Sequence, residues 1–209
     1  MAFKRYKEIG EVAQKLDLIL TSENFVKPSK IAVPKHLEQD LDYVIKNMPY
    51  KASEAAICEL IIAPILKEVW KNFDKSLTLW SHKAIRFSKE LGGIPDYIIA
   101  KRSHRGVVVF EKPILAVIEA KKDDFDGGWG QCATEMLTIQ RINANSQIPV
   151  YGIVSNGENW EFGKLVQNQL IKNLTPYSLA DLSQLFAAIN FSLQECVHTV
   201  NQLIKYEKQ

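Results

Sequence analysis

The stretch that most constrains the fold is Pro113 to Lys121, Pro-Ile-Leu-Ala-Val-Ile-Glu-Ala-Lys. Within residues 114–120 both alternating sets of positions are apolar, with Glu119 as the exception, so a strand here would present apolar side chains on each of its faces. Strands that are buried on both faces lie in the middle of a sheet that helices cover on each side. This stretch therefore predicts a layered α/β (α+β) architecture.

The rest of the chain supplies the other elements of such an architecture. Apolar residues at three- and four-residue spacings predict helices, and short alternating or continuous apolar runs predict strands. Helices are predicted at 3–20, from Pro34 onward, and at 53–72, 129–145, 178–189 and 192–206; strands are predicted at 76–87, 97–100, 107–110, 114–120, 150–154 and 160–165. Residues 21–33 and 167–177 are expected as irregular connections. The order predicts one domain over residues 1–209, with helical flanks at 1–50 and 178–207.

Local signals sharpen three of these predictions. Ser53 is a good N-cap for the helix at 53–72, and Pro64 within that helix is expected to kink it. Ser155-Asn156-Gly157 predicts the hairpin turn that joins the strands at 150–154 and 160–165.

Composition excludes several classes of protein. Hydrophobic residues make up 46% of the 209 residues and charged ones 24%, which is typical of a globular chain with a proper core. The longest apolar run is too short to cross a bilayer, no signal-peptide pattern occurs, and the three cysteines show no paired spacing. A reduced cytoplasmic protein with no membrane partner is expected. The net charge of +2 means that any basic surface must be local.

Polar residues at the ends of two predicted strands form the candidate site. Asp96 follows a Gly-Gly-Ile-Pro turn and opens one strand, whereas Glu119 and Lys121 end another and project to the same face of it. If the two strands pair antiparallel, Asp96 approaches Glu119. Two carboxylates and the Ala120 carbonyl would suit Mg²⁺, and Lys121 beside them could orient or deprotonate an attacking water. At 100° per residue, Glu54 heads the apolar stripe of the helix at 53–72, whereas Glu59 does not.

These residues resemble the PD-(D/E)XK nuclease superfamily, whose members share the restriction-endonuclease-like fold. Pro95-Asp96 and Glu119-Ala120-Lys121 match the motif that names the superfamily, over a nuclease-like core of about residues 53–165. Glu54 resembles the acidic residue that many members carry before the sheet. Gln131 resembles the glutamine of RecB-like nucleases and type I restriction subunits. Some RecB-like members place a tyrosine four residues after that glutamine, where this chain has Glu135.

The resemblance implies a mixed sheet with flanking helices and a metal-dependent nuclease that acts on DNA. It implies that Asp96, Glu119 and Ala120 hold Mg²⁺, with Mn²⁺ as a substitute, and that Lys121 assists the nucleophile. Glu54 and Gln131 would complete the catalytic set, with Gln131 orienting a ligand or the lysine. Because many related nucleases act as pairs, a homodimer is compatible with this prediction.

Phosphate contacts would have to come from local basic clusters. Lys101, Arg102 and Arg105 share one predicted loop, and Lys122 follows the site lysine. Lys83, Arg86 and Lys89 lie shortly before Asp96. Such clusters are more often a solvated face, so binding to nucleic acid is a hypothesis for each of them.

Two further interpretations remain open. The chain could be a catalytically inactive module on the same fold that binds nucleic acid or protein, or a purely structural partner protein. Other enzyme chemistries are not supported, because the four histidines lack ligand spacing and no nucleophile elbow, P-loop or dinucleotide fingerprint occurs.

Overall fold

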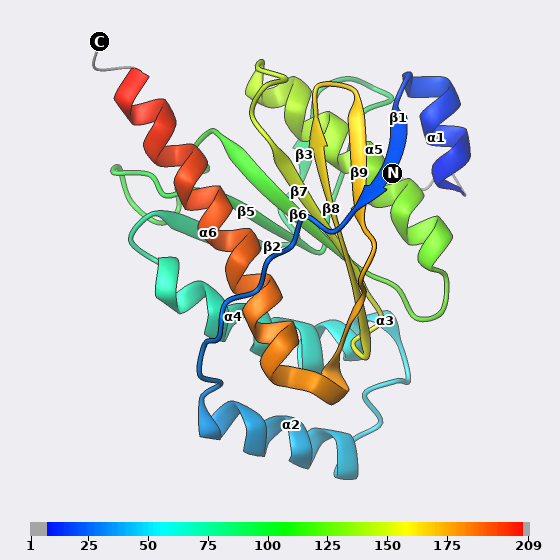
Figure 1. Cartoon of the computed structure of the whole chain (residues 1–209), viewed down its shortest axis with the longest axis vertical. Coiled ribbons are helices and arrows are strands. Elements are labelled where there is room, and N and C mark those ends of the chain that lie inside the picture. Colours follow the sequence, from blue (N-terminus) through cyan, green and yellow to red (C-terminus); the bar gives the residue numbers. More distant parts are fainter. Residues whose placement is uncertain (1–7, 207–209) are drawn as a thin grey trace.

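An eight-stranded mixed sheet runs through the middle of the molecule (Figure 1). The computed structural model describes residues 8–206. The sheet has the order β1-β9-β8-β7-β6-β5-β2, and β10 pairs with β8. Its strands are β1 (Ile19–Glu23), β2 (Leu77–Ser81), β5 (Tyr97–Lys101), β6 (Ile114–Ala120), β7 (Val150–Ser155), β8 (Asn159–Val166), β9 (Gln169–Asn173) and β10 (Tyr177–Ser178). A separate short hairpin joins β3 (Ile85–Arg86) to β4 (Gly92–Gly93).

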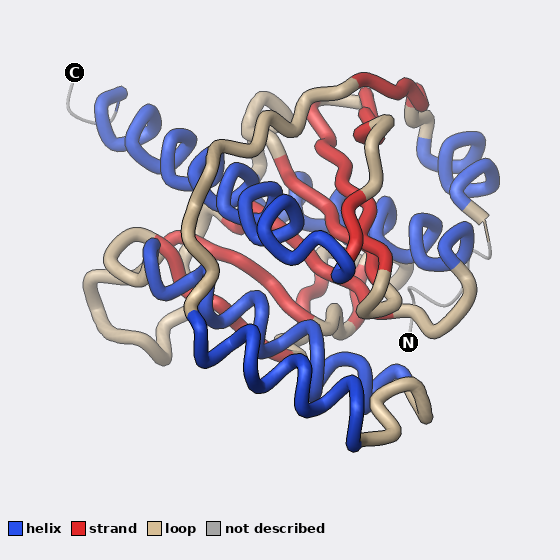
Figure 2. Tube along the Cα trace, turned by 60° about the horizontal axis from the view of Figure 1, so that its bottom comes forward, coloured by secondary structure: helices blue, strands red, loops and turns tan. Residues whose placement is uncertain are grey.

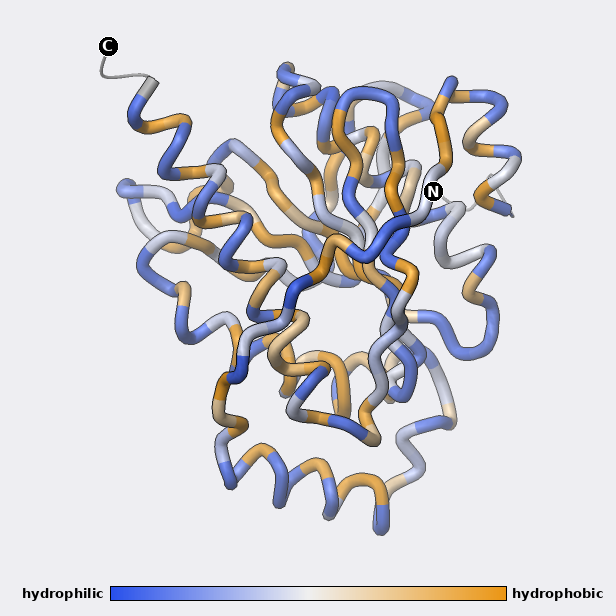
Figure 3. The backbone as a smooth tube through the Cα atoms, in the orientation of Figure 1, coloured by the Kyte–Doolittle hydropathy of each residue, from blue (hydrophilic) through white to orange (hydrophobic). Residues whose placement is uncertain are grey.

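Helices cover both faces of the sheet, as Figure 2 shows from a second direction. One face carries α1 (Ile9–Leu16) and α5 (Phe125–Asn143); the other carries α2 (Lys35–Asn47), α3 (Glu54–Ile57), α4 (Ala63–Trp70) and α6 (Leu182–Tyr206). A hydrophobic core fills each interface. In α2 the hydrophobic positions face the rest of the protein and the hydrophilic ones face away (Figure 3). The predicted fold class is confirmed: a large mixed sheet between flanking helices, compatible with the restriction-endonuclease-like fold.

The predicted central strand is confirmed as β6. All seven of its residues are buried. It pairs antiparallel with β5 and parallel with β7, and α5 makes the crossover that a parallel connection requires. Val117 packs in the core beneath α5, whereas Ile118 and Ala120 pack in the core beneath α4 and α6. Glu119 therefore points toward α5.

The predicted helix at 3–20 is wrong at its C-terminal end, and its residues 3–7 lie outside the described part of the chain. Helix α1 ends where Asp17 takes a left-handed conformation (φ 55°). Residues 19–23 then form β1, which pairs in parallel with β9 at the edge of the sheet. The predicted linker at 167–177 is likewise wrong, because it contains β9 and β10. Strand β9 forms a hairpin with β8 across Gln167, which takes a left-handed conformation (φ 54°) without a glycine to signal it. Strand β1 depends on β9, which is distant in sequence, so local patterns do not reveal it.

Two other predicted elements are wrong. Residues 107–110 form a turn, in which the Val109 N–H donates to the Gly106 carbonyl, and Val108 is 82% exposed. The predicted helices at 178–189 and 192–206 are a single helix, α6, preceded by a 3₁₀ turn at Leu179–Asp181. Asn190 and Ser192 are buried within α6, and the Ser192 hydroxyl donates to the Ala188 carbonyl. Burial in the tertiary structure thus keeps the helix continuous at Asn190 and Ser192, although these polar residues favour a break between two helices.

Local signals predicted two boundaries well. The Ser53 hydroxyl accepts from the Ala56 N–H as the N-cap of α3, and the β7–β8 turn uses Gly157 at φ 84°. The predicted helix at 53–72 contains a π-helical turn, Cys58–Ile62, between α3 and α4, and Pro64 follows it in the first turn of α4. Helix α5 begins at Phe125 rather than 129, because the Asp124 carboxylate caps it by accepting from the Gly127 N–H.

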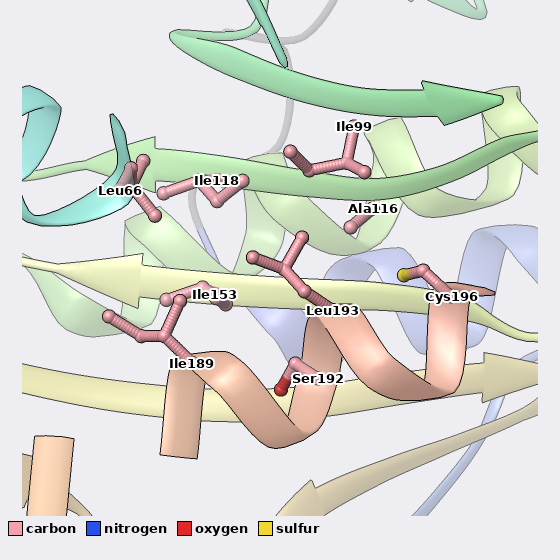
Figure 4. A pocket seen from close by; sticks show the side chains of 9 residues that line it. All are labelled: Leu66, Ile99, Ala116, Ile118, Ile153, Ile189, Ser192, Leu193 and Cys196. Carbon is pink, nitrogen blue, oxygen red and sulfur yellow. The ribbon is translucent and has the colours of Figure 1, made fainter. Parts of the chain in front are cut away.

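A small apolar cavity lies between α6 and the sheet (Figure 4). It is lined by Leu66, Ile99, Ala116, Ile118, Ile153, Ile189, Ser192, Leu193 and Cys196. Of the helices within residues 8–206, none combines the length and the apolar character that crossing a bilayer requires.

Candidate active site

The start of β5 and the end of β6 bring the predicted carboxylates together. Tyr97 pairs with Ile118 in the antiparallel register, so Asp96 lies beside Glu119. The Asp96 N–H donates to Glu119 Oε1 at 3.3 Å, and the Ala120 N–H donates to Asp96 Oδ2 at 2.8 Å. Each strand thus holds the carboxylate of the other through a backbone donor.

Lys121 joins this pair from the same face of the strand as Glu119. Its Nζ lies 3.8 Å from Glu119 Oε2, and its side chain is 15% exposed. Gly128 makes room for it, because a Cβ at that position would lie 2.8 Å from Lys121 Cγ and 2.7 Å from Val154 Cγ1. Close packing of the aliphatic part of Lys121 therefore holds its ammonium group at the rim of the carboxylate pair.

Helix α5 contributes Gln131 and Glu135 from successive turns. Gln131 Nε2 donates to Glu119 Oε2 at 2.7 Å and to Glu135 Oε1 at 3.1 Å. Gln131, which the resemblance includes in the catalytic set, therefore contacts Glu119 directly. In the sequence Glu135 is only a departure from a family pattern, and its position one helical turn after Gln131 is the signal that places it in the site.

Three carboxyl groups crowd together here with one ammonium. Burial, followed by the charge of Asp96, raises the pKa of Glu119 to about 7, while its hydrogen bonds and Lys121 oppose that rise. Burial also raises the pKa of Asp96, against the hydrogen bond from Ala120 and the charge of Lys121. Burial and the charge of Glu119 raise the pKa of Glu135. Because desolvation and mutual repulsion disfavour the ionised forms, a bound cation would stabilise the cluster.

Two residues flank the cluster. Glu54 is exposed in the first turn of α3, close enough for its charge to raise the pKa of Asp96. His82, which sequence reasoning set aside, donates its N–H to the Asp96 carbonyl, and its Nε2 lies 3.6 Å from Asp96 Oδ1. The pairing of β2 with β5 places His82 there, because Ser81 pairs with Tyr97 and the next residue, His82, then lies beside Asp96.

The structure does not bring the predicted basic loop to the carboxylates. Lys101, Arg102 and Arg105 lie at the opposite end of β5 from Asp96, and Arg102 donates to the Asp74 carbonyl. Lys122 is exposed directly after Lys121. The exposed Arg86 and Lys89 belong to the segment at 82–95, which runs from the end of β2 to Asp96. This second cluster therefore lies on the segment of the chain that leads into the site.

The donor set fits a hard divalent cation. Within residues 8–206 no group of three or more His, Cys, Asp or Glu side chains is arranged to bind a metal. A cation at Asp96 and Glu119 would thus have two carboxylates, the predicted Ala120 carbonyl and water as ligands. Mg²⁺ commonly binds in this way, because it retains several waters and needs few protein ligands.

Comparisons with known proteins add little to this geometry. No family model matches the chain. No curated protein matches it either. Among solved structures, the type IIG restriction endonuclease BpuSI is similar at 16% identity and a TM-score of 0.42. The match covers 73% of this chain but only 18% of that protein, far less than two thirds of its length. The site residues themselves therefore carry the information about function.

Proposed function

We propose that this protein is a metal-dependent nuclease that hydrolyses phosphodiester bonds in DNA, with Mg²⁺ as its cation and Mn²⁺ as a substitute. The observation that carries the proposal is the pair of backbone hydrogen bonds that hold Asp96 and Glu119 side by side, with Lys121 at their rim. Paired acids next to an ammonium are the groups that water attack at phosphorus needs.

Each residue has a defined part in this proposal. Asp96 and Glu119 would hold the cation, which when bound stabilises the negative charge that develops on phosphate and acidifies its bound water. Lys121 would orient the attacking water through its N–H donors. Gln131 holds Glu119 Oε2, and Glu54 adds negative charge on the side of α3.

DNA is proposed as the substrate because cations lie where a backbone would pass. Arg86, Lys89 and Lys122 are exposed on segments that lead directly into or out of the site. Phosphate contacts from such residues position a duplex without reading its sequence. The proposal therefore includes no base preference.

A cleavage assay tests the proposal. Purified protein should cut plasmid or linear DNA with Mg²⁺ or Mn²⁺ and not with EDTA. Asp96→Asn and Lys121→Ala should each lower the rate by about 10²–10⁴-fold. Lys122→Ala is the matched control, since it removes the neighbouring exposed ammonium and should keep most of the activity. Equal rates for Asp96→Asn, Lys121→Ala and the wild type would identify a contaminating nuclease and reject the assignment.

One observation favours a second candidate, a binding module with an inactive site. Both oxygens of Glu119 already accept hydrogen bonds from the protein, so this side chain is satisfied without a cation. Calorimetric titration with Mg²⁺ and Mn²⁺ separates the two functions. An inactive site should bind neither ion, whereas the nuclease should bind both.

A further inference from the structure

Glu135 is a buried acid that the proposed chemistry does not yet use. It belongs to the middle of helix α5, and its exposed fraction is 0%. Its Oε1 accepts one hydrogen bond from Gln131, no N–H donor of residues 8–206 reaches its Oε2, and its carboxyl group lies directly beside that of Glu119. An unsatisfied buried carboxyl oxygen destabilises a fold, so packing alone does not account for an acid at this position.

Glu135 meets the site in two ways, by direct contact of its carboxyl group with that of Glu119 and through the amide of Gln131. The second contact sets geometry. That amide has two N–H donors, and they are used on Glu119 Oε2 and Glu135 Oε1. Turning the amide over would place its oxygen against two carboxyl groups. Glu135 therefore fixes which end of Gln131 faces Glu119.

Glu119 is held on both sides as a result. Its Oε2 is anchored by Gln131 and its Oε1 faces the Asp96 backbone. A side chain that is fixed in this way presents its carboxylate in one orientation, and such preorganisation governs how tightly a cation binds.

We propose that Glu135 is a positioning residue of the cation site, which acts by locking the amide of Gln131 and thereby the carboxylate of Glu119. This inference depends on the proposed function, because it assigns Glu135 a role in binding the same cation. It requires the hydrogen-bond acceptor at residue 135 and not the negative charge there.

Two substitutions separate the acceptor from the charge. Glu135→Gln keeps the shape and an acceptor oxygen for Gln131. Glu135→Met keeps the length in an apolar form and removes the acceptor. Calorimetric titration with Mn²⁺ should give wild-type affinity for Glu135→Gln and binding that is about 10–100-fold weaker for Glu135→Met. The melting temperature of cation-free Glu135→Met should not fall, because the unsatisfied acid is gone.

Equal Mn²⁺ affinity in Glu135→Met and the wild type would overturn the inference. An equal loss of Mn²⁺ affinity in Glu135→Gln would overturn it too, because the negative charge would then be what the site requires.

If the wild type binds no cation, the proposed function fails, and the positioning role is decided separately by NMR. The side-chain amide signals of Gln131, assigned by their loss in Gln131→Ala, should keep their shifts and slow exchange in Glu135→Gln and lose them in Glu135→Met. Unchanged signals in Glu135→Met would refute the positioning role of Glu135.

Discussion

The Asp96 N–H donates to the carboxylate of Glu119, over 3.3 Å between N and Oε1. The Ala120 N–H in turn donates to Asp96 Oδ2. The backbone of the two strands therefore holds the two carboxylates together. Neighbouring carboxylates repel one another, so the sheet imposes a proximity that the side chains alone would not adopt. That imposed proximity makes the pair a place where protons or a cation are favoured.

Without a cation, the protein should lose stability as the pH rises through the site's titration. The folded-state pKa values of Asp96, Glu119 and Glu135 are raised, so the folded protein holds more protons than the unfolded chain between 4.5 and about 7, the ordinary and raised values for Glu119. Their contribution is fully present below that window and is lost across it. Urea unfolding in EDTA at several pH values measures this trend. Glu135→Gln should show a shallower fall, and a steeper one would contradict the assignment.

Mg²⁺ should stabilise the protein more at high pH than at low pH. Protons compete with the cation for the same carboxylates, so binding strengthens once Glu119, with its pKa raised to about 7, is ionised. Thermal melting with and without Mg²⁺ should show a larger shift above that pH than below 4.5, the ordinary value. A shift of the same size at both ends would place the cation elsewhere.

Reversing charge beside the site should weaken DNA binding more than reversing it at the far end of β5. Arg86→Glu with Lys89→Glu changes the cluster on the segment that leads to Asp96, and Lys101→Glu with Arg105→Glu is the matched control. The first pair should lower affinity and reduce the salt dependence by about one unit of slope for each lost phosphate contact. Fluorescence anisotropy across a salt series gives both quantities. A larger effect from the control pair would move the DNA path to the loop at 101–105.

Gly128→Ala should displace Lys121. The added Cβ would lie 2.8 Å from Lys121 Cγ and 2.7 Å from Val154 Cγ1, so one of them must move. Overpacking of this kind costs about 1–3 kcal/mol, and the cleavage rate should fall with the misplaced ammonium. Gly10→Ala is the control, because a Cβ in helix α1 meets nothing within 4 Å and alanine should stabilise it by about 0.5–1 kcal/mol. Full activity in Gly128→Ala would show that the position of Lys121 is not critical.

Leu193→Ala should enlarge the apolar cavity beneath α6. Leu193 is 4% exposed and lines that cavity, so its truncation should cost about 2–5 kcal/mol of unfolding free energy. Leu174→Ala removes the same atoms from a side chain that is 61% exposed and should change stability by less than about 0.5 kcal/mol. Urea midpoints compare the two, and similar losses would mean that α6 does not close the core.

The sequence by itself determined the features that arise from local pattern. The doubly apolar run at 114–120 specified a central strand, Ser53 specified a helix start, and Asn156-Gly157 specified a hairpin. Because side chains alternate along a strand, Glu119 and Lys121 had to share a face. The antiparallel register then brought Asp96 to Glu119.

Tertiary structure alone decided the rest. Strand β1 exists through its pairing with β9, about 150 residues away in sequence, as in Ile19 with Gln169, and burial keeps α6 continuous past Asn190. The tertiary structure also placed His82 and Glu135 at the carboxylates and left Lys101 at the far end of β5. Local periodicity shows which face of an element is apolar. Which elements meet depends on contacts between residues distant in sequence, and those contacts determine which polar residues share the site.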